Sequence, residues 1–175
     1  MNLKDHIRSI QDYPKKGILF RDITTLIKNT KAFNYTIDQI VERSKKFKID
    51  KIAAMESRGF LFASAVSYIL KKPFILLRKK NKLPADVHSI DFKLEYGTAT
   101  MQVHKDSIEK NDSVLIIDDL IATGGTAHAA AELIEISEGK VSGFIFVINL
   151  FDLGGSDNLI KKNYCVENLV DFPGH

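Results

Sequence analysis

Four short runs of apolar residues, each followed by polar or turn-forming residues, are the clearest pattern along the chain. They cover residues 52–55, 74–77, 114–117 and 144–150. Continuous apolar runs of this length are typical of strands that are buried on both faces, as in a parallel sheet. We therefore expect four buried strands in the interior of the fold.

Helical patterns separate these runs. Apolar residues within 33–41 recur at a spacing that gives a helix one apolar face, residues 60–70 predict a mostly apolar helix, and residues 127–136 predict an alanine-rich one. Strands that alternate with helices predict the α/β class, here a doubly wound, mostly parallel sheet with helices on both faces. No repeat or linker divides the chain, so we expect residues 1–175 to form a single domain.

Two neighbouring segments depart from this alternation. Residues 95–103 are polar and mixed, which predicts an exposed or antiparallel strand. Residues 85–93 show no apolar periodicity, and we expect a mobile lid there.

Composition and charge narrow the class of protein. Hydrophobic residues make up 45% and charged residues 27% of the chain, as in an ordinary globular domain. The net charge of +3 divides into +10 over residues 1–100 and −7 over residues 101–175, which argues against a uniformly basic nucleic-acid binder. Cys165 is the only cysteine, which fits a reducing compartment. Neither a bilayer-spanning apolar run nor a signal-like N-terminus is seen, so we expect a cytoplasmic protein.

An acidic pair and a glycine-rich loop follow the third apolar run. Asp118 and Asp119 stand at the end of a buried strand, where two like charges need a divalent cation or sugar hydroxyls to compensate them. The next residues, Ala-Thr-Gly-Gly-Thr at 122–126, offer backbone amides and a helix N-terminus to one phosphate. Neither a Walker A nor a dinucleotide-binding spacing is present. The structural alternative is a helix capped by Thr123 or Thr126.

Residues 114–126 closely resemble the phosphoribosyl-pyrophosphate signature of type I phosphoribosyltransferases. The resemblance implies that family's fold, with a small N-terminal hood at about residues 1–28 and a flexible lid at about 83–95. It also implies that Asp118 and Asp119 are catalytic residues at the ribose. The 5-phosphate of phosphoribosyl pyrophosphate or of AMP would be bound by Ala122, Thr123, Gly124, Gly125 and Thr126.

Two other strand exits carry cations and polar groups. Glu56-Ser57-Arg58 comes directly before a predicted helix, and Arg78-Lys79 opens a run of basic residues. Guanidinium groups and helix N-termini suit polyphosphates. The sequence Glu-Ser-Arg-Gly-Phe resembles the form found in adenine phosphoribosyltransferases, which implies that Glu56, Ser57, Arg58, Arg78 and Lys79 serve the pyrophosphate. We expect Lys80 and Lys82 to be surface residues.

Base recognition is implied by two further segments. Residues 13–23 resemble the hood segment of the adenine-specific group, in which Phe20 would stack on the purine while Leu19 and Arg21 read its edge through their backbones. Glu95 would exchange a proton with N7 of the base, with Tyr96 beside it in the lid. Taken alone, Phe20 would be assigned to the core and Glu95 to a strand edge.

The resemblance therefore implies transfer of phosphoribose from 5-phosphoribosyl-1-pyrophosphate to adenine, giving AMP and pyrophosphate. It implies Mg²⁺ bound mainly by the substrate, with Asp118 and Asp119 as its protein candidates and no fixed metal site, and a homodimer without nucleic-acid or membrane partners. Two alternatives stay open: a type I enzyme acting on xanthine, hypoxanthine, guanine or orotate, and a nucleic-acid-binding regulator that senses phosphoribosyl pyrophosphate. In a receiver-type phosphoacceptor domain, by contrast, the acidic pair follows the first strand.

Overall fold

The computed structural model describes residues 1–93 and 97–174. In these residues a seven-stranded sheet has the order β5-β6-β4-β3-β7-β8-β9. Its strands are β3 (Lys51–Met55), β4 (Phe74–Lys79), β5 (Val87–Lys93), β6 (Thr98–His104), β7 (Ser113–Ile121), β8 (Lys140–Leu150) and β9 (Val166–Phe172). The neighbouring pairs β4–β3, β3–β7, β7–β8 and β8–β9 are parallel. Strand β6 pairs antiparallel with both β4 and β5. The expected doubly wound, mostly parallel sheet is confirmed.

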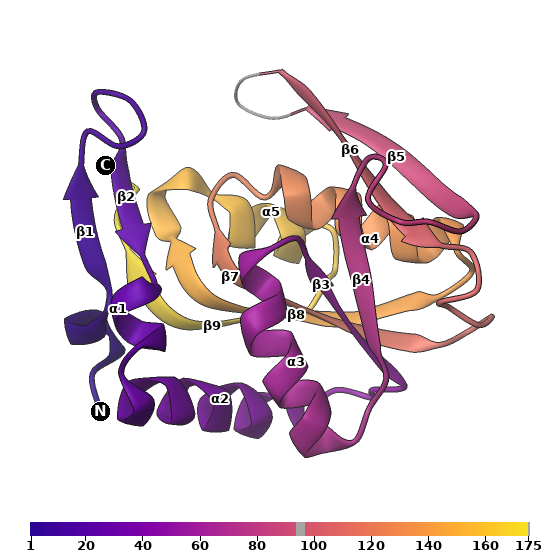
Figure 1. The fold of residues 1–175 in the computed structure, drawn as a ribbon, viewed down its shortest axis with the longest axis horizontal. Helices are drawn as coiled ribbons and strands as arrows, with labels where there is room; N and C mark the ends of the chain where they lie inside the picture. The colour runs from indigo at the N-terminus through magenta and orange to yellow at the C-terminus, as the bar shows by residue number, and fades with distance from the viewer. Residues whose placement is uncertain (94–96, 175) are drawn as a thin grey trace.

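Helices cover both faces of this sheet (Figure 1). Helices α2 (Thr30–Ser44) and α3 (Arg58–Leu70) lie on one face, and α4 (Gly125–Ile136) and α5 (Gly155–Lys161) lie on the other. Alternate residues of each central strand enter opposite cores, as Ala53 and Ala54 of β3 do. Both are fully buried, which explains why these strands have continuous apolar sequences.

A small hairpin stands apart from the central sheet. It pairs β1 (Arg8–Gln11) with β2 (Leu19–Asp22), between a short 3₁₀ helix (η1, Leu3–His6) and α1 (Thr24–Ile27). Asp22 accepts hydrogen bonds from the Thr24 amide and hydroxyl and from Arg8. These bonds, the one from the Thr24 amide above all, lower the pKa of Asp22 to about 2. The Asp22 carboxylate therefore ties the hairpin to the helix that follows it.

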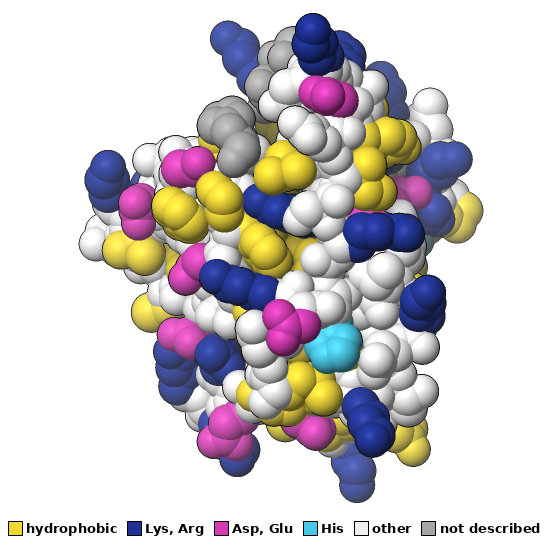
Figure 2. Space-filling model, turned by 90° about the vertical axis from the view of Figure 1, so that its left-hand side faces the viewer, with side chains coloured by type: hydrophobic (Ala, Val, Ile, Leu, Met, Phe, Trp, Pro, Cys, Tyr) yellow, Lys and Arg dark blue, Asp and Glu magenta, His cyan; other side chains and the backbone are white. Residues whose placement is uncertain are grey.

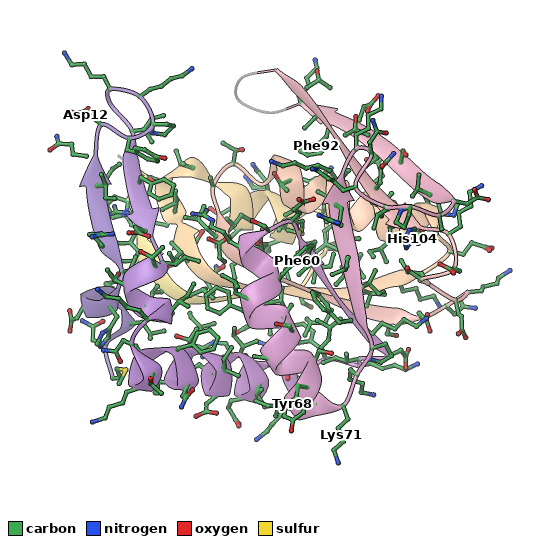
Figure 3. All side chains as sticks on the ribbon, viewed as in Figure 1. Asp12, Phe60, Tyr68, Lys71, Phe92 and His104 are labelled. Atoms are coloured by element: carbon green, nitrogen blue, oxygen red, sulfur yellow. The ribbon has the colours of Figure 1, made fainter. Side chains whose placement is uncertain are left out.

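The segment expected to act as a lid contains a regular strand, and the expected lack of apolar periodicity is wrong for residues 87–93. They form β5, which pairs along its whole length with β6. Ile90 and Phe92 alternate with polar residues and pack against the core on the α4 side, and Figure 3 labels Phe92 in this hairpin. The antiparallel strand expected nearby is confirmed at residues 98–103. Leu94, Glu95 and Tyr96 lie outside the described residues.

Two C-terminal elements have no counterpart in the sequence prediction. They are α5, which follows the 3₁₀ helix η2 (Phe151–Leu153), and β9 at the edge of the sheet. Among the residues that the structure describes, no helix has the length and apolar character needed to cross a membrane.

The charge division along the sequence does not produce a face of one sign on the hairpin side of the molecule. Figure 2 shows basic and acidic side chains mixed across that surface. The consequence of the division is local, at the carboxyl ends of the strands.

Candidate active site

The carboxyl ends of β3, β4 and β7 meet at one edge of the sheet, on the side where the β1–β2 and β5–β6 hairpins rise (Figure 1). They surround a cavity of about 450 Å³. Its lining includes most of the predicted ribose, phosphate and pyrophosphate residues: Glu56, Ser57, Arg58, Lys79, Asp118, Asp119, Ala122, Thr123, Gly124, Gly125 and Thr126. Three segments that lie far apart in the sequence are therefore brought to one place.

The acidic pair lies at the end of β7. Asp119 is 4% exposed, and its Oδ2 lies 2.9 Å from Nε of Arg58 in an ion pair. That oxygen has no hydrogen bond of good geometry within the described chain. The Asp119 amide donates to Oδ1 of Asp118 at 2.9 Å. The Asp119 carboxylate is thus held by the charge of Arg58 rather than by a well-directed hydrogen bond.

Burial raises the pKa of both carboxyl groups. The neighbouring charge of Asp119 raises the pKa of Asp118 further, whereas Arg58 opposes the rise at Asp119. Such a pair is electrostatically unfavourable in the ligand-free protein, and bound cationic charge or hydroxyl donors would relieve the repulsion.

Gly59 makes room for the acidic pair. It lies in the first turn of α3, and a Cβ atom there would be only 2.6 Å from Oδ1 of Asp118 and 3.2 Å from the carbonyl oxygen of Ile117. The missing side chain lets the Asp118 carboxylate lie against the N-terminal end of α3, which carries partial positive charge. Gly59 therefore sets the position of Asp118.

The glycine-rich loop leads from β7 into α4. Gly124 is the N-cap of that helix, with φ of +89°, and no side chain caps it. The alternative that Thr123 or Thr126 caps the helix is therefore wrong. Within the described chain, the amides of Gly125, Thr126 and Ala127 have no acceptor. Unpaired amides at a helix N-terminus form an anion-binding site.

The residues predicted to bind pyrophosphate divide into two groups. Ser57, Arg58 and Lys79 line the cavity. Arg78 instead donates from two of its nitrogens to the Glu56 carboxylate, each at 3.3 Å, and from the third to the Lys82 carbonyl at 3.1 Å. The Lys79 amide also donates to Glu56 at 3.1 Å. Burial alone would raise the pKa of Glu56, but these bonds outweigh it and lower the pKa. Glu56 thus holds the end of β4 beside the cavity.

The hairpin contributes Phe20 to the same region. The Arg58 guanidinium lies 5.4 Å from the centre of the Phe20 ring, and the Tyr13 ring packs edge-on against Phe20 at 5.1 Å. Arg58 is therefore shared between Phe20 and the acidic pair.

The backbone of β2 faces two ways. The Ile18 carbonyl accepts from the Tyr13 amide at 3.2 Å, so the Ile18 backbone points toward β1. Backbone groups alternate along an antiparallel strand, so those of Leu19 and Arg21 point to the opposite edge. In the described chain no other strand pairs with that edge. Leu19 and Arg21 can therefore offer donors and acceptors to a ligand.

The Arg21 side chain is used elsewhere. It is 5% exposed, lies 4.5 Å from the centre of the Phe172 ring and donates to the Pro173 carbonyl at 2.7 Å. Burial lowers the pKa of Arg21, and the charge of Asp152 opposes that change. The side chain fixes the hairpin to the C-terminal segment.

Several residues at the cavity were not assigned from the sequence. Phe146 of β8 lines it, and Gly155 packs beneath the glycine-rich loop. The glycine pair at 154–155, following a buried strand, is the sequence signal that could have indicated the second contact. Glu95 and Tyr96 are outside the described residues, but the Lys93 carbonyl oxygen would be 3.2 Å from a Cβ on Gly125. The described end of β5 therefore lies beside the glycine-rich loop.

Comparison with known proteins agrees with this geometry. Residues 24–169 match the phosphoribosyl transferase domain family. An adenine phosphoribosyltransferase of Pelagibacter ubique is 77% identical over the whole of both chains. The adenine phosphoribosyltransferase of Thermoanaerobacter pseudethanolicus superposes with a TM-score of 0.93 at 44% identity, covering 97% of this chain and 98% of that one. The Saccharomyces cerevisiae enzyme, solved with an imino-altritol bisphosphate and adenine, gives 0.88 at 35% identity, covering 96% of each chain.

A mostly parallel sheet with an acidic pair and a glycine-rich loop at its carboxyl edge is typical of type I phosphoribosyltransferases, and the domain match assigns the chain to that family. Within it, full-length identity of 77% shows that the chain belongs to the adenine phosphoribosyltransferases. The alternative of a nucleic-acid-binding regulator is not favoured by these relationships.

The raised pKa of Asp118 predicts that Asp118→Asn stabilises the ligand-free protein. The folded protein retains a proton at Asp118 to higher pH than the unfolded chain does, so this group's contribution to stability falls as pH rises above the ordinary value of 3.8. At pH 7.5 the variant should melt at least about 2 °C higher than the parent, as for a gain of about 1 kcal/mol in a chain of this size.

Thermal unfolding followed from pH 7.5 down to 4 tests this expectation. The advantage of Asp118→Asn should shrink as the pH falls, whereas Asp106→Asn, at an exposed turn, should change nothing. A variant that melts below the parent at pH 7.5 would show that the carboxylate is not a source of repulsion.

Proposed function

We propose that this chain transfers the 5-phosphoribosyl group from 5-phosphoribosyl-1-pyrophosphate to N9 of adenine, releasing AMP and pyrophosphate. In the reaction the bond from C1′ to the pyrophosphate oxygen breaks, the bond from C1′ to N9 forms, and adenine gives up a ring proton. The observation that carries the proposal is one cavity that joins the glycine-rich loop at residues 122–126, called the phosphate loop from here on, to the acidic pair and the cations Arg58 and Lys79.

The phosphate loop and the acidic pair hold the ribose 5-phosphate part. The unpaired amides at the start of α4 receive the 5-phosphate, with the hydroxyls of Thr123 and Thr126 beside them. Asp118 and Asp119 accept bonds from the ribose hydroxyls. As the bond to pyrophosphate breaks, positive charge develops on the sugar, and the two carboxylates stabilise it.

The pyrophosphate lies toward β3 and β4. Arg58 and Lys79 stabilise the charge of the leaving group, and Ser57 offers a hydroxyl at the start of α3. Glu56 and Arg78 act at this end through their mutual ion pair, which fixes the position of Lys79.

Mg²⁺ accompanies phosphoribosyl pyrophosphate in this proposal. Among residues 1–93 and 97–174 no three His, Cys, Asp or Glu side chains are grouped to hold a metal ion. The donor set that fits is therefore the substrate's own oxygens with help from Asp118 and Asp119, whose repulsion a cation would reduce. When bound, the ion neutralises charge on the departing pyrophosphate.

Adenine lies against the β1–β2 hairpin. Phe20 stacks on the base, while the free backbone edge at Leu19 and Arg21 accepts from the exocyclic amine and donates to a ring nitrogen. A carbonyl oxygen cannot satisfy a 6-oxo group, so this edge discriminates against hypoxanthine and guanine. Glu95 exchanges the proton at N7, and Tyr96 belongs to the same lid.

Two copies of the chain form a homodimer through α3 and β4. Leu61, Tyr68 and Ile69 are exposed on α3, and Leu76 is exposed on β4. Leu76 lies on the same sheet face as α3, because its neighbours Ile75 and Leu77 enter the opposite core. Figure 3 shows Tyr68 pointing away from the body of the molecule. Adjacent apolar residues of this kind are typical of subunit interfaces.

We place the enzyme in the cytoplasm, since its only cysteine is free.

Base specificity tests the proposal directly. With phosphoribosyl pyrophosphate and Mg²⁺, adenine should release pyrophosphate with a kcat/KM at least about 10³-fold above those of hypoxanthine, guanine, xanthine and orotate, because mismatched bases leave buried polar groups unpaired. A comparable rate with any of the other bases would overturn the assignment. Oligonucleotide binding with a steep salt dependence would instead support a regulator.

The proton transfer assigned to Glu95 predicts that Glu95→Gln lowers kcat by roughly 10²–10⁴. Phosphoribosyl pyrophosphate should still bind, because this substitution leaves the residues of the phosphate loop unchanged; calorimetry measures that binding. Glu109→Gln, at an exposed ion pair, provides the matched control and should leave kcat unchanged. An unchanged kcat in the Glu95 variant would remove this residue from the mechanism.

The proposed interface predicts a particle of twice the 19.7 kDa chain mass in light scattering. Tyr68→Glu should shift it toward the monomer at micromolar concentration, because the residue is 85% exposed in a single chain and the introduced charge would be buried in the dimer. Ile160→Glu, which alters an exposed apolar residue on α5, should leave the dimer intact. A monomeric parent chain would refute the interface.

A further inference from the structure

The phosphate loop rests directly on the backbone of a second segment. The Gly155 amide donates to the Ala122 carbonyl at 3.0 Å. A Cβ on Gly155 would be 2.3 Å from that carbonyl oxygen and 2.8 Å from the Gly124 nitrogen. A Cβ on Gly124 would in turn be 3.2 Å from the Cα of Gly155. Two glycine backbones are therefore packed in contact: Gly155 has no space for a side chain, and a Cβ at Gly124 would be tightly packed.

The segment beneath the loop is fixed to the sheet. Gly155 is buried and begins α5, and Gly154 reaches a left-handed φ of +72° just before it. The next residue, Ser156, is buried and donates to Oδ1 of Asn149 on β8 at 3.1 Å. The Asn149 amide donates to Asp171 on β9 at 2.8 Å. This chain of hydrogen bonds fixes the start of α5 relative to both C-terminal strands.

We propose that Gly155 is a positioning residue for the 5-phosphate site. It supports the loop at Ala122 and Gly124, and so determines where the amides at the start of α4 point. The inference rests on the proposed function, in which those amides bind the 5-phosphate. It assigns to the 154–155 glycine pair a role in binding the 5-phosphate and none in binding adenine, pyrophosphate or the ribose hydroxyls.

A Cβ at position 155 must displace the loop, because the nearest atoms it meets, the Ala122 carbonyl oxygen and the Gly124 nitrogen, are backbone and cannot turn away. Gly155→Ala should therefore raise the KM for phosphoribosyl pyrophosphate at least about tenfold, since a shift of about 1 Å in a binding site can change rates ~10²-fold. The KM for adenine and the kcat at saturating substrates should stay within about threefold of the parent. Steady-state kinetics with each substrate varied in turn measures this division.

Gly143→Ala is the matched control. Its Cβ would be 2.2 Å from the Phe47 ring in the core, at the other end of β8, so it should lower the melting temperature without raising either KM. If Gly155→Ala is folded and its KM for phosphoribosyl pyrophosphate is within about twofold of the control value, the proposal is wrong.

A milder variant decides the question if Gly155→Ala does not fold. Ser156→Ala adds no bulk and removes only the side-chain bonds that fix α5, so it should raise the same KM at least about threefold and leave the KM for adenine unchanged. Equal changes in both constants, or none, would refute the positioning role.

Calorimetry with ribose 5-phosphate separates this inference from the proposed reaction. The ligand tests the phosphate site without a base, so weaker binding to Gly155→Ala supports the role of Gly155 even if adenine proves not to be the substrate. Unchanged ribose 5-phosphate binding by a folded Gly155→Ala would overturn the role whatever the base.

Discussion

Two adjacent carboxylates at the end of the central strand β7 are the constraint on which the site depends. Burial raises the pKa of both, and the charge of Asp119 raises the pKa of Asp118 further. Arg58 compensates Asp119 from the neighbouring strand exit, and Gly59 leaves space for Asp118 against the positive end of α3. The compensation is incomplete, since Arg58 lowers the pKa of Asp118 too little to offset burial and the charge of Asp119. The ligand-free site therefore favours a ligand that brings hydroxyl donors and positive charge, as a ribose does when it approaches its transition state.

The strand order places cationic residues from the basic part of the sequence beside the acidic pair from the acidic part. The chain passes from β4 through the β5–β6 hairpin to β7, which lies on the opposite side of β3. This crossing places the exits of β3 and β4, with Arg58 and Lys79, beside the acidic exit of β7. Ligands of doubly wound sheets bind where the strand order reverses. Only a few of the residues that make up the charge balances of +10 and −7 lie at this edge, and on the face shown in Figure 2 basic and acidic side chains are mixed.

Local sequence was sufficient to predict an element or a site residue wherever the pattern lay within one strand or one loop. The strands near 52–55 and 114–117 are buried on both faces, so their apolar runs identify them without knowledge of the fold. β5 was missed because Ile90 and Phe92 acquire a buried face only after β6 pairs with them. The partner of Arg78 was missed for the same reason, as Glu56 meets it only when β3 and β4 align. Contacts between distant segments thus mark the limit of the sequence prediction, and the support of the phosphate loop by Gly155 is one of them.

Much of the recognition at this site is performed by backbone. The 5-phosphate faces amides of α4 in our proposal, adenine faces the free edge of β2, and glycines at 59, 124 and 155 allow the close approaches that put these groups in place. A residue keeps its backbone N–H and C=O groups when its side chain is replaced by most others. Side-chain exchange at Leu19 therefore leaves its backbone donor and acceptor intact. A single added Cβ at a supporting glycine displaces several of them together. Specificity in such an enzyme is therefore encoded less by the residues that contact the substrate than by the residues that leave space for the contacting backbone.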